Sequence, residues 1–381
     1  MNDQRRTIGR REVLRAAGSL ALAGTAAACA PTPAVDTAPE RPYSRKAWAA
    51  PRVSMDAVIR VIVGHRPYRP SGFVVKKEVF DATTVVHNYG HGGGGLSLSW
   101  GSSALAVRET LGMTPGDVAV IGSGVMGLTS ARLLQDAGWN VTIYTRDPWR
   151  HTTSNVAAGE WSPYSVYESG RASAEFLSRF DWASKVAHHA YTNLTGPEYG
   201  IRWLEGYTLG TRPFSGFDGR PELHSLYAYK QNLAPGEHPF GDYYAQSFVT
   251  MQIDPGVLLR RLIDDFRIAG GSFVVRDFKG LDQVLGLSEK VVFNCTGLGS
   301  RELFGDEELT AAKGQLVYLP PDPAVDFFTF GGGSGILYMF PRSDVIVLGG
   351  TFKPGDFSRH VEPDETERIV SSHQSLFAKF G

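Results

Sequence analysis

A glycine-rich segment with polar and aromatic residues at fixed places is the part of the chain best suited to chemistry. Residues 87–95 read His-Asn-Tyr-Gly-His-Gly-Gly-Gly-Gly, and small residues follow as far as Gly101. Glycines let the backbone approach a ligand closely, and their N–H groups can bind an anion. The small residues indicate that the loop leads into a helix N-terminus, which suits a phosphate or an electron-rich ring edge. The sequence therefore predicts a ligand-binding loop. The alternative is a flexible linker, but linkers seldom carry His, Asn, Tyr and Trp.

A second glycine pattern lies between two predicted strands. Residues 118–121 are apolar and typical of a buried strand, Gly122, Gly124 and Gly127 follow at once, and a second strand is expected over 141–144. In this context the first glycine permits the turn, the second admits a pyrophosphate, and the third allows the helix to pack closely on the sheet. The pattern therefore predicts a dinucleotide-binding βαβ unit.

Several further elements should position these loops. A helix is expected over 102–111, and a strand over 291–294 leads into a small-residue turn, Cys295 to Gly297. Turns at the carboxyl ends of parallel strands border the cofactor in doubly wound sheets. Cys295 is expected to be a packing residue rather than a nucleophile, because no base lies near it in the sequence. Residues 336–340 and 345–348 are expected to form two strands of an antiparallel layer.

Composition and charge exclude several classes of protein. The 381 residues carry 38 Lys plus Arg against 39 Asp plus Glu, so no strong field attracts nucleic acid. The two cysteines, Cys29 and Cys295, cannot form a disulfide framework or a cysteine-rich zinc site. No metal site is expected, since the ten histidines show no HExxH pattern, and no GxSxG motif supplies a serine nucleophile. Catalysis must therefore depend on a cofactor.

The glycine loop and the fingerprint together resemble the D-amino acid oxidase family of flavoproteins. In that family an Arg-Pro-x-Arg-Pro element and a His-Asn-Tyr-Gly-His-Gly-Gly loop follow a Gly-Gly-Thr strand near the C-terminus. Here the two elements lie at 66–70 and 87–93, before the fingerprint, while Gly-Gly-Thr stands at 349–351. We therefore expect a circular permutation, tolerable where chain ends are adjacent at the surface, with the resemblance covering about 58–381. The alternative is an independent N-terminal domain.

The resemblance implies an α/β fold in which an FAD-binding, Rossmann-like, doubly wound domain is interleaved with an α+β substrate domain built on an antiparallel sheet. Residues 51–381 form the permuted oxidase. The FAD-binding parts are expected at about 81–165 and 245–315, and the substrate-domain parts at about 51–80, 166–244 and 316–381.

The resemblance also implies the reaction, an FAD-dependent oxidative deamination of D-amino acids. A hydride leaves Cα for flavin N5, and water and oxygen complete the conversion to a 2-oxo acid, ammonia and hydrogen peroxide. Arg66 matches the arginine that forms a two-pronged pair with the substrate carboxylate, with a surface salt bridge as its alternative. Tyr338 matches a tyrosine on the same carboxylate, and the Gly93 carbonyl would accept from the amine. The expected FAD-binding residues are Gly122, Ser123, Gly124, Val125, Met126, Gly127, Arg146, Asp147, Thr152, Thr153, Ser154, Ala158, Gly159, Phe278, Gly92, Gly95, Leu96 and Ser97.

The chain departs from the family pattern at three places. The acidic residue usual for the ribose hydroxyls is replaced by Arg146 at the strand end, with Asp147 one residue later. Ser334 takes the place of a second active-site tyrosine, and Tyr164 is expected to line the side-chain pocket. Glu160 occupies a usually apolar position by the flavin. It could attract a basic or polar substrate side chain, but we expect it to pair with a neighbouring residue.

Four other functions compete with this interpretation. A glycine or sarcosine oxidase would use the same fold, and a D-aspartate oxidase would need an extra cation, for which Arg342 is a weak candidate. A flavin-binding lipoprotein without turnover would not need the complete carboxylate clamp. A nicotinamide dehydrogenase would have no use for the glycine loop at 87–95.

The N-terminal segment is expected to be a targeting signal. Arg10 and Arg11 precede a small, mildly apolar run that is too short to span a membrane, as in a twin-arginine export signal over 1–29. Cys29 would become a lipidated N-terminus, or the signal would simply be cleaved after Ala28. Residues 30–50 are rich in proline and are expected to be a tether. The partners would be the export machinery and a lipid anchor, on the periplasmic or extracellular face of the membrane. The oligomeric state is left open.

Overall fold

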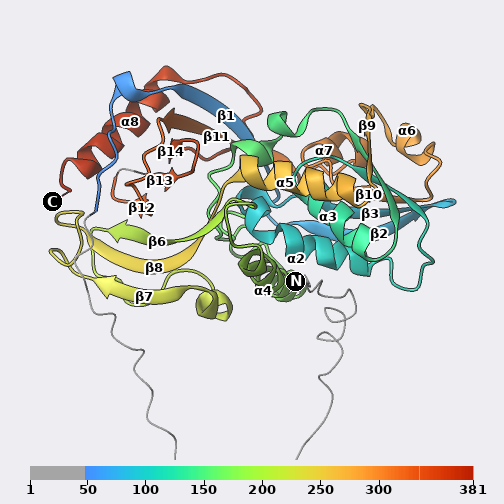
Figure 1. Ribbon diagram of the computed structural model, residues 1–381, viewed down its shortest axis with the longest axis horizontal. Coiled ribbons are helices and arrows are strands. Elements are labelled where there is room, and N and C mark those ends of the chain that lie inside the picture. The colour runs from blue at the N-terminus through green and yellow to red at the C-terminus, as the bar shows by residue number, and fades with distance from the viewer. Residues whose placement is uncertain (1–47, 334, 381) are drawn as a thin grey trace, which may run out of the picture. The chain divides into compact units, whose positions relative to one another are not determined.

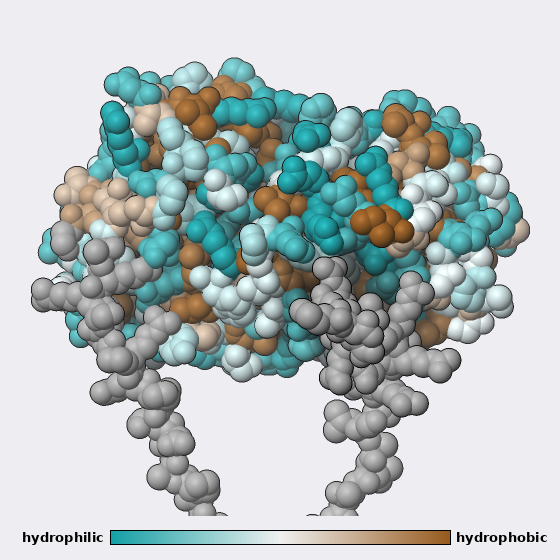
Figure 2. Space-filling view, viewed as in Figure 1, coloured by the Kyte–Doolittle hydropathy of each residue, from teal (hydrophilic) through white to brown (hydrophobic). Residues whose placement is uncertain are grey.

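The computed structural model describes residues 48–333 and 335–380, which belong to one compact unit built on two β-sheets (Figure 1). The expected signal, Cys29 and most of the tether lie outside the described residues, as does Ser334. Among the described helices, none combines the length and the apolar character that crossing a membrane requires. Figure 2 shows one face of the unit, on which hydrophobic residues are scattered in small groups between hydrophilic ones.

The six-stranded sheet carries the fingerprint. Its strand order is β2-β3-β10-β4-β5-β9, and every neighbouring pair is parallel except β2 with β3. This confirms the predicted βαβ unit, in which β4 ends just before Gly122 and the chain returns through a helix to β5. The strands are β2 (Val74–Phe80), β3 (Thr83–Tyr89), β4 (Asp117–Ile121), β5 (Asn140–Thr145), β9 (Ser272–Val275) and β10 (Val291–Asn294).

Three helices pack beside one another on this sheet, namely α2 (Gly95–Arg108), α3 (Val125–Asp136) and α5 (Pro255–Ile268) (Figure 1). The helix expected over 102–111 begins earlier, at Gly95, where the glycine loop adopts right-handed helical dihedrals. The glycines conceal this start because they have low helix propensity. Gly101 inside α2 permits close packing, since an added Cβ would lie 1.8 Å from the Ala183 carbonyl oxygen of α4 (Ala174–Asn193).

The nine-stranded sheet forms the other layer and is antiparallel apart from the parallel pair β12 and β6. Its order is β1-β11-β14-β13-β12-β6-β8-β7, β15 pairs with β11, and α8 (Pro363–Phe377) packs on β11 and β14. The antiparallel pairing of β13 with β14 confirms the expected layer. The strands are β1 (Arg60–Tyr68), β6 (Ile201–Gly210), β7 (Ala228–Leu233), β8 (Tyr244–Ile253), β11 (Thr310–Leu319), β12 (Phe327–Gly331), β13 (Tyr338–Pro341), β14 (Ile346–Gly349) and β15 (Lys353–Pro354).

The segment before the fingerprint enters both sheets. Strand β1 pairs with β11 from Arg60 opposite Tyr318 to Tyr68 opposite Thr310, while β2 and β3 extend the six-stranded sheet. The alternative of an independent N-terminal domain is therefore wrong. The expected domain boundaries do not follow the two sheets. Strand β2, expected in the substrate domain, joins the six-stranded sheet, while β8 and the first half of β11, expected in the FAD-binding part, join the nine-stranded sheet.

The remaining short elements lie in the connections. They are η1 (Met55–Ala57), η2 (Gly92–Gly94), η3 (Trp149–His151), η4 (Thr153–Val156), η5 (Pro221–Leu226), α6 (Leu281–Leu285) and α7 (Gly299–Phe304).

Candidate active site

A cavity of about 820 Å³ is lined by loops at the carboxyl ends of the parallel strands and by residues of the nine-stranded sheet. It brings together residues that the sequence analysis singled out at widely separated positions. Of the expected site residues, the following line it: Arg66, Gly92, Gly93, Gly95, Leu96, Gly122, Ser123, Gly124, Val125, Met126, Arg146, Asp147, Thr152, Thr153, Ser154, Ala158, Gly159, Glu160, Tyr164, Phe278 and Tyr338.

Two expected cofactor residues do not line the cavity. Gly127 packs α3 on the sheet, since a Cβ there would lie 1.9 Å from the Gly122 carbonyl oxygen. The Ser97 hydroxyl donates to the Glu160 carbonyl oxygen (3.2 Å) and accepts from the Ser162 N–H (2.9 Å). Ser97 therefore fixes the segment that carries Glu160, a contact that the sequence alone did not reveal.

The fingerprint turn can hold a pyrophosphate against the N-terminus of α3. Gly122 has φ +112°, and a Cβ there would lie 2.5 Å from the Cys295 carbonyl oxygen, so only glycine fits. The Val125 N–H donates to the Ser154 hydroxyl (3.1 Å), which places the expected hydroxyl run at the start of this helix. Burial raises the pKa of the Cys295 thiol to about 12, so the thiol stays neutral, as expected of a packing residue.

The end of β5 carries the charged pair that departs from the family pattern. Arg146 forms an ion pair with Asp147, with 2.7 Å between Nη2 and Oδ2, and both residues line the cavity. Further along, the Arg276 guanidinium lies 4.7 Å from the centre of the Phe278 ring. These residues form the polar and aromatic end of the cavity, where an adenosine would be bound.

The glycine loop presents unpartnered polar atoms within the same cavity. The His91 ring is stacked on Phe73 at 4.8 Å, and burial lowers its pKa to about 3, so it is neutral. Its Nε2 and the Asn88 Oδ1 are buried and have no hydrogen-bond partner. The Gly93 N–H donates to the Ser165 carbonyl oxygen at 2.9 Å, which holds the loop against the segment that follows Tyr164. A cradle of glycines with unsatisfied buried polar atoms fits a polar, ring-shaped cofactor such as a flavin.

Residues 153–160 form the wall between the two sheets. Gly159 has φ +94°, and a Cβ there would lie 2.0 Å from the Ile253 carbonyl oxygen. Arg342 donates to the carbonyl oxygens of Asn155 (3.3 Å) and Ala157 (3.2 Å) and pairs with Asp344. Arg342 does not line the cavity, so the extra cation proposed for a D-aspartate oxidase is not supplied by this residue.

The carboxylate clamp is assembled from opposite ends of the chain. The Arg66 Nη2 donates to the Tyr338 hydroxyl (3.1 Å), and its Nη1 donates to the Thr351 carbonyl oxygen (3.2 Å). These bonds orient the planar Arg66 guanidinium, which lines the cavity in a position that could bind a carboxylate.

Sequence reasoning missed the two glycines that make room for this clamp. A Cβ on Gly314 would lie 2.4 Å from the Arg66 Nη1, and one on Gly349 would lie 2.1 Å from the Tyr338 ring. Gly349 belongs to the recognised Gly-Gly-Thr motif, but no local signal links Gly314 to Arg66. The cavity also contains Leu316, Phe330, Phe340, Phe357 and Arg359, which no motif marked.

The expected pairing of Glu160 with a neighbour is wrong. Its Oε1 is buried without a hydrogen-bond partner, and no ion pair joins its carboxyl to any described residue. Desolvation raises the pKa of this carboxyl well above its ordinary value. The pairing could not be judged from the sequence, because it depends on which cations approach through space.

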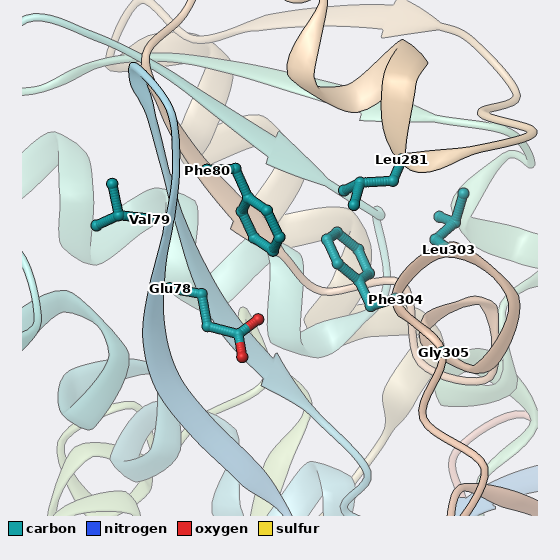
Figure 3. Close-up of a pocket in the computed structure, with 7 residues that line it drawn as sticks. All are labelled: Glu78, Val79, Phe80, Leu281, Leu303, Phe304 and Gly305. Atoms are coloured by element: carbon teal, nitrogen blue, oxygen red, sulfur yellow. The ribbon is translucent and has the colours of Figure 1, made fainter.

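A second hollow lies on the outer edge of the six-stranded sheet and contains none of the expected site residues. Figure 3 shows Phe80, Leu281 and Phe304 directed toward one another, with the Glu78 side chain beside them. Glu78 is already bonded to Lys76 and to His87 (3.0 Å to its Nε2). Within the described residues, no cluster of His, Cys, Asp or Glu could hold a metal ion.

Comparison with known proteins agrees with this geometry. Residues 117–381 match a family model described as FAD dependent oxidoreductase. A D-amino-acid oxidase of Rubrobacter xylanophilus is 30% identical over 259 residues, which cover 68% of this chain and 76% of that relative. A D-amino-acid oxidase of Streptomyces coelicolor is 31% identical over 260 residues, which cover 67% of this chain and 76% of that relative.

A likeness in fold extends to solved structures. The glycine oxidase of Geobacillus kaustophilus is similar with a TM-score of 0.52 at 19% identity, over 69% of this chain and 78% of that one. Both the family match and the cavity indicate FAD as the cofactor. The chain therefore belongs to the FAD-dependent oxidoreductase family that includes the D-amino-acid oxidases.

Proposed function

We propose that this protein oxidises D-amino acids to 2-oxo acids, ammonia and hydrogen peroxide, with FAD as its cofactor and oxygen as the electron acceptor. The observation that carries the proposal is the Arg66–Tyr338 clamp, which opens into the same cavity as the dinucleotide fingerprint. The two bacterial relatives at 30% and 31% identity are D-amino-acid oxidases, which supports the same reaction here.

The residues of the chain orient the substrate. Arg66 forms two parallel hydrogen bonds with the α-carboxylate, and the Tyr338 hydroxyl binds the same group. The Gly93 carbonyl accepts from the α-amine, so both polar groups are held and Cα–H takes one direction. FAD, when bound, would supply the hydride acceptor and the path of the electrons to oxygen. The neutral amine assists with its lone pair, so no side chain has to act as a general base.

The FAD-binding roles follow the walls of the cavity. Gly122 to Met126 and Ser154 would hold the pyrophosphate, Phe278 and the Arg146–Asp147 pair would border the adenosine, and Ala158 with Gly159 would contact the ring system. The α2 N-terminus, at Gly95 and Leu96, supplies N–H groups to the other end of the flavin. Donors at that place stabilise the negative charge of the reduced ring.

Peroxide release and flavin bleaching test the proposal directly. The protein that begins after residue 29 is purified and mixed with paired D- and L-amino acids, glycine and sarcosine. Turnover confined to D-enantiomers supports the proposal. An Arg66→Ala variant that keeps its flavin but loses turnover supports the role of Arg66 in binding the substrate carboxylate. A yellow protein that oxidises only glycine or sarcosine, or nothing, overturns the function and leaves the fold unchanged.

We also propose that the motif order arose by circular permutation. In support, Trp48 and Phe380, at the two ends of the described chain, both pack against the same hydrophobic cluster of the nine-stranded sheet. A rearranged gene that places residues 51–112 after residue 380 through a short linker should give a yellow, active protein. A colourless, unfolded product would contradict the proposal.

We further propose export through the twin-arginine machinery with a lipid on Cys29. The paired arginines and the small run before Cys29 are the support. Cell fractionation of the wild type and of a variant with Lys at 10 and 11 tests export, and labelling with a radioactive fatty acid tests Cys29 against Cys29→Ser. Wild-type protein found only in the cytoplasm would remove the basis of this proposal.

A further inference from the structure

The wall of the cavity includes an acidic residue, Glu160, that the mechanism does not use. Glu160 forms an isolated bridge with Gln252 of β8, and its carboxyl belongs to the cavity wall together with Ser162 and Tyr164. The Ser162 hydroxyl is bonded to the Tyr227 hydroxyl at 3.1 Å. The buried Oε1 of Glu160 has no hydrogen-bond partner, and Glu160 also lines the cavity, so a ligand bound there can approach its side chain.

The surroundings of Glu160 add negative charge rather than compensating it. The carboxylates of Glu160 and Asp218 both raise the pKa of Tyr164 and of Tyr227, alongside the larger effect of desolvation, so both acids lie near these two rings. Asp218 is on the exposed loop after β6 and does not line the cavity. The acidic region of the cavity is therefore defined as Glu160 with Ser162 and Tyr164.

Glu160 has no cationic partner among the described residues. Arg220 is held by two hydrogen bonds of 2.7 Å to Asp181, and Arg342 is held by Asp344 and by backbone carbonyl oxygens. Arg66 belongs to the clamp. Burying a lone carboxyl is unfavourable, and an incoming cation would relieve that cost.

We propose that Glu160 is a specificity-determining residue that selects D-amino acids with a cationic side chain, such as D-lysine, D-ornithine and D-arginine. This inference rests on the proposed function. Arg66 binds the α-carboxylate and Glu160 binds the distal ammonium or guanidinium group, so the substrate is held by opposite charges at its two ends. The aromatic residues Phe330 and Phe340, which line the same cavity, provide apolar surface for the methylene stem.

The first test compares substrates of equal shape. D-2-Aminoheptanoate carries a methyl group where D-lysine carries its ammonium group, so their kcat/KM ratio measures the charge alone. We expect D-lysine to be preferred by about tenfold or more in the wild type, because a buried charge pair discriminates strongly. In Glu160→Gln the ratio of the two kcat/KM values should fall by about tenfold. Asp218→Asn is the control, and because water screens an exposed carboxylate, its ratio should change by less than about threefold.

The second test does not depend on turnover. 6-Aminohexanoate is lysine without its α-amine, so it cannot be oxidised, and heptanoate is its uncharged counterpart. The dissociation constants of both, from thermal shift of the flavin-loaded protein, should favour 6-aminohexanoate in the wild type and lose that preference in Glu160→Gln. Equal binding of the two in the wild type would overturn the inference.

The outcomes separate the inference from the function. A wild-type enzyme that oxidises D-2-aminoheptanoate at least as well as D-lysine overturns the role of Glu160 and leaves the D-amino acid oxidase intact. An unchanged ratio in Glu160→Gln does the same. A protein that oxidises none of the D-amino acids overturns the proposed function, and the role of Glu160 in substrate choice with it.

Discussion

Gly314→Ala should disable the clamp while leaving the fold almost untouched. The new Cβ would lie 2.4 Å from the Arg66 Nη1 and 2.9 Å from its Cζ. Ordinary carbon contacts are about 3.5 Å, so the guanidinium has to move by about 1 Å. The bonds of Arg66 to the Tyr338 hydroxyl (3.1 Å) and the Thr351 carbonyl (3.2 Å) would then be stretched past hydrogen-bond length.

The size of the effect follows from those bonds. A hydrogen bond to a charged group contributes about 1.5–3 kcal/mol, and a displacement of about 1 Å in a substrate-positioning group costs about 100-fold in rate. We therefore expect kcat/KM for the best D-amino acid to fall by about 10- to 100-fold. The free energy of unfolding should change by less than about 1 kcal/mol, because the atom that must move is the end of a flexible side chain.

The assay combines steady-state peroxide release, the flavin-to-protein absorbance ratio and urea unfolding. Gly116→Ala is the matched control, since nothing lies within 4 Å of a Cβ at that glycine. Gly349→Ala, whose Cβ meets the stiffer Tyr338 ring at 2.1 Å, should lose activity and stability together. If Gly314→Ala keeps wild-type kcat/KM with full flavin content, the conclusion that this glycine makes room for a fixed Arg66 is wrong.

Three further substitutions test other parts of the site. Gly122→Ala should abolish flavin binding, because its Cβ would lie 2.5 Å from the Cys295 carbonyl oxygen, and retained yellow colour would contradict the role of this turn. Arg342→Met should lower the free energy of unfolding by about 2 kcal/mol or more, since it leaves buried carbonyl oxygens and Asp344 without their donor; urea unfolding measures this, and an unchanged midpoint would contradict it. His91, with a pKa of about 3 in the folded chain and about 6.5 when unfolded, takes up its proton only on unfolding between these values. Because of His91, the free energy of unfolding of the wild type should therefore fall by about 2 kcal/mol between pH 7 and pH 5, and His91→Phe should lack this loss. If the unfolding free energies of the two proteins changed with pH in parallel, this role of His91 would be refuted.

The fingerprint unit could be predicted from the sequence because its signals are local. The apolar strand, the glycine turn and the following helix are adjacent in the chain, and the residue types of each segment are typical of the structure it forms. The resemblance implied that Arg66 and Tyr338 serve one substrate carboxylate, and the two side chains are hydrogen-bonded although 272 positions separate them. That expectation came from the resemblance and not from the spacing of these two residues.

The errors concern contacts that only the folded sheet creates. Glu160 was expected to pair with a neighbour, but its buried Oε1 has no hydrogen-bond partner. Gly314 has no distinguishing feature in the sequence, because its contact with Arg66 arises only when β1 pairs with β11. The start of α2 was missed because the glycines at 92–95 have low helix propensity, and the helix begins at the last of them.

The clamp has a consequence for biosynthesis, because its parts are translated far apart. Every strand of the six-stranded sheet has left the ribosome once Asn294 has emerged, so that sheet can form early. Arg66 must wait for Gly314, Tyr338 and Thr351, and β1 stays without its partner until β11 has been made. Contacts between such distant segments form slowly, and until then β1 is an unpaired edge open to aggregation. A chain interrupted before Tyr338 can therefore complete the six-stranded sheet but lacks the tyrosine whose hydroxyl accepts from Arg66.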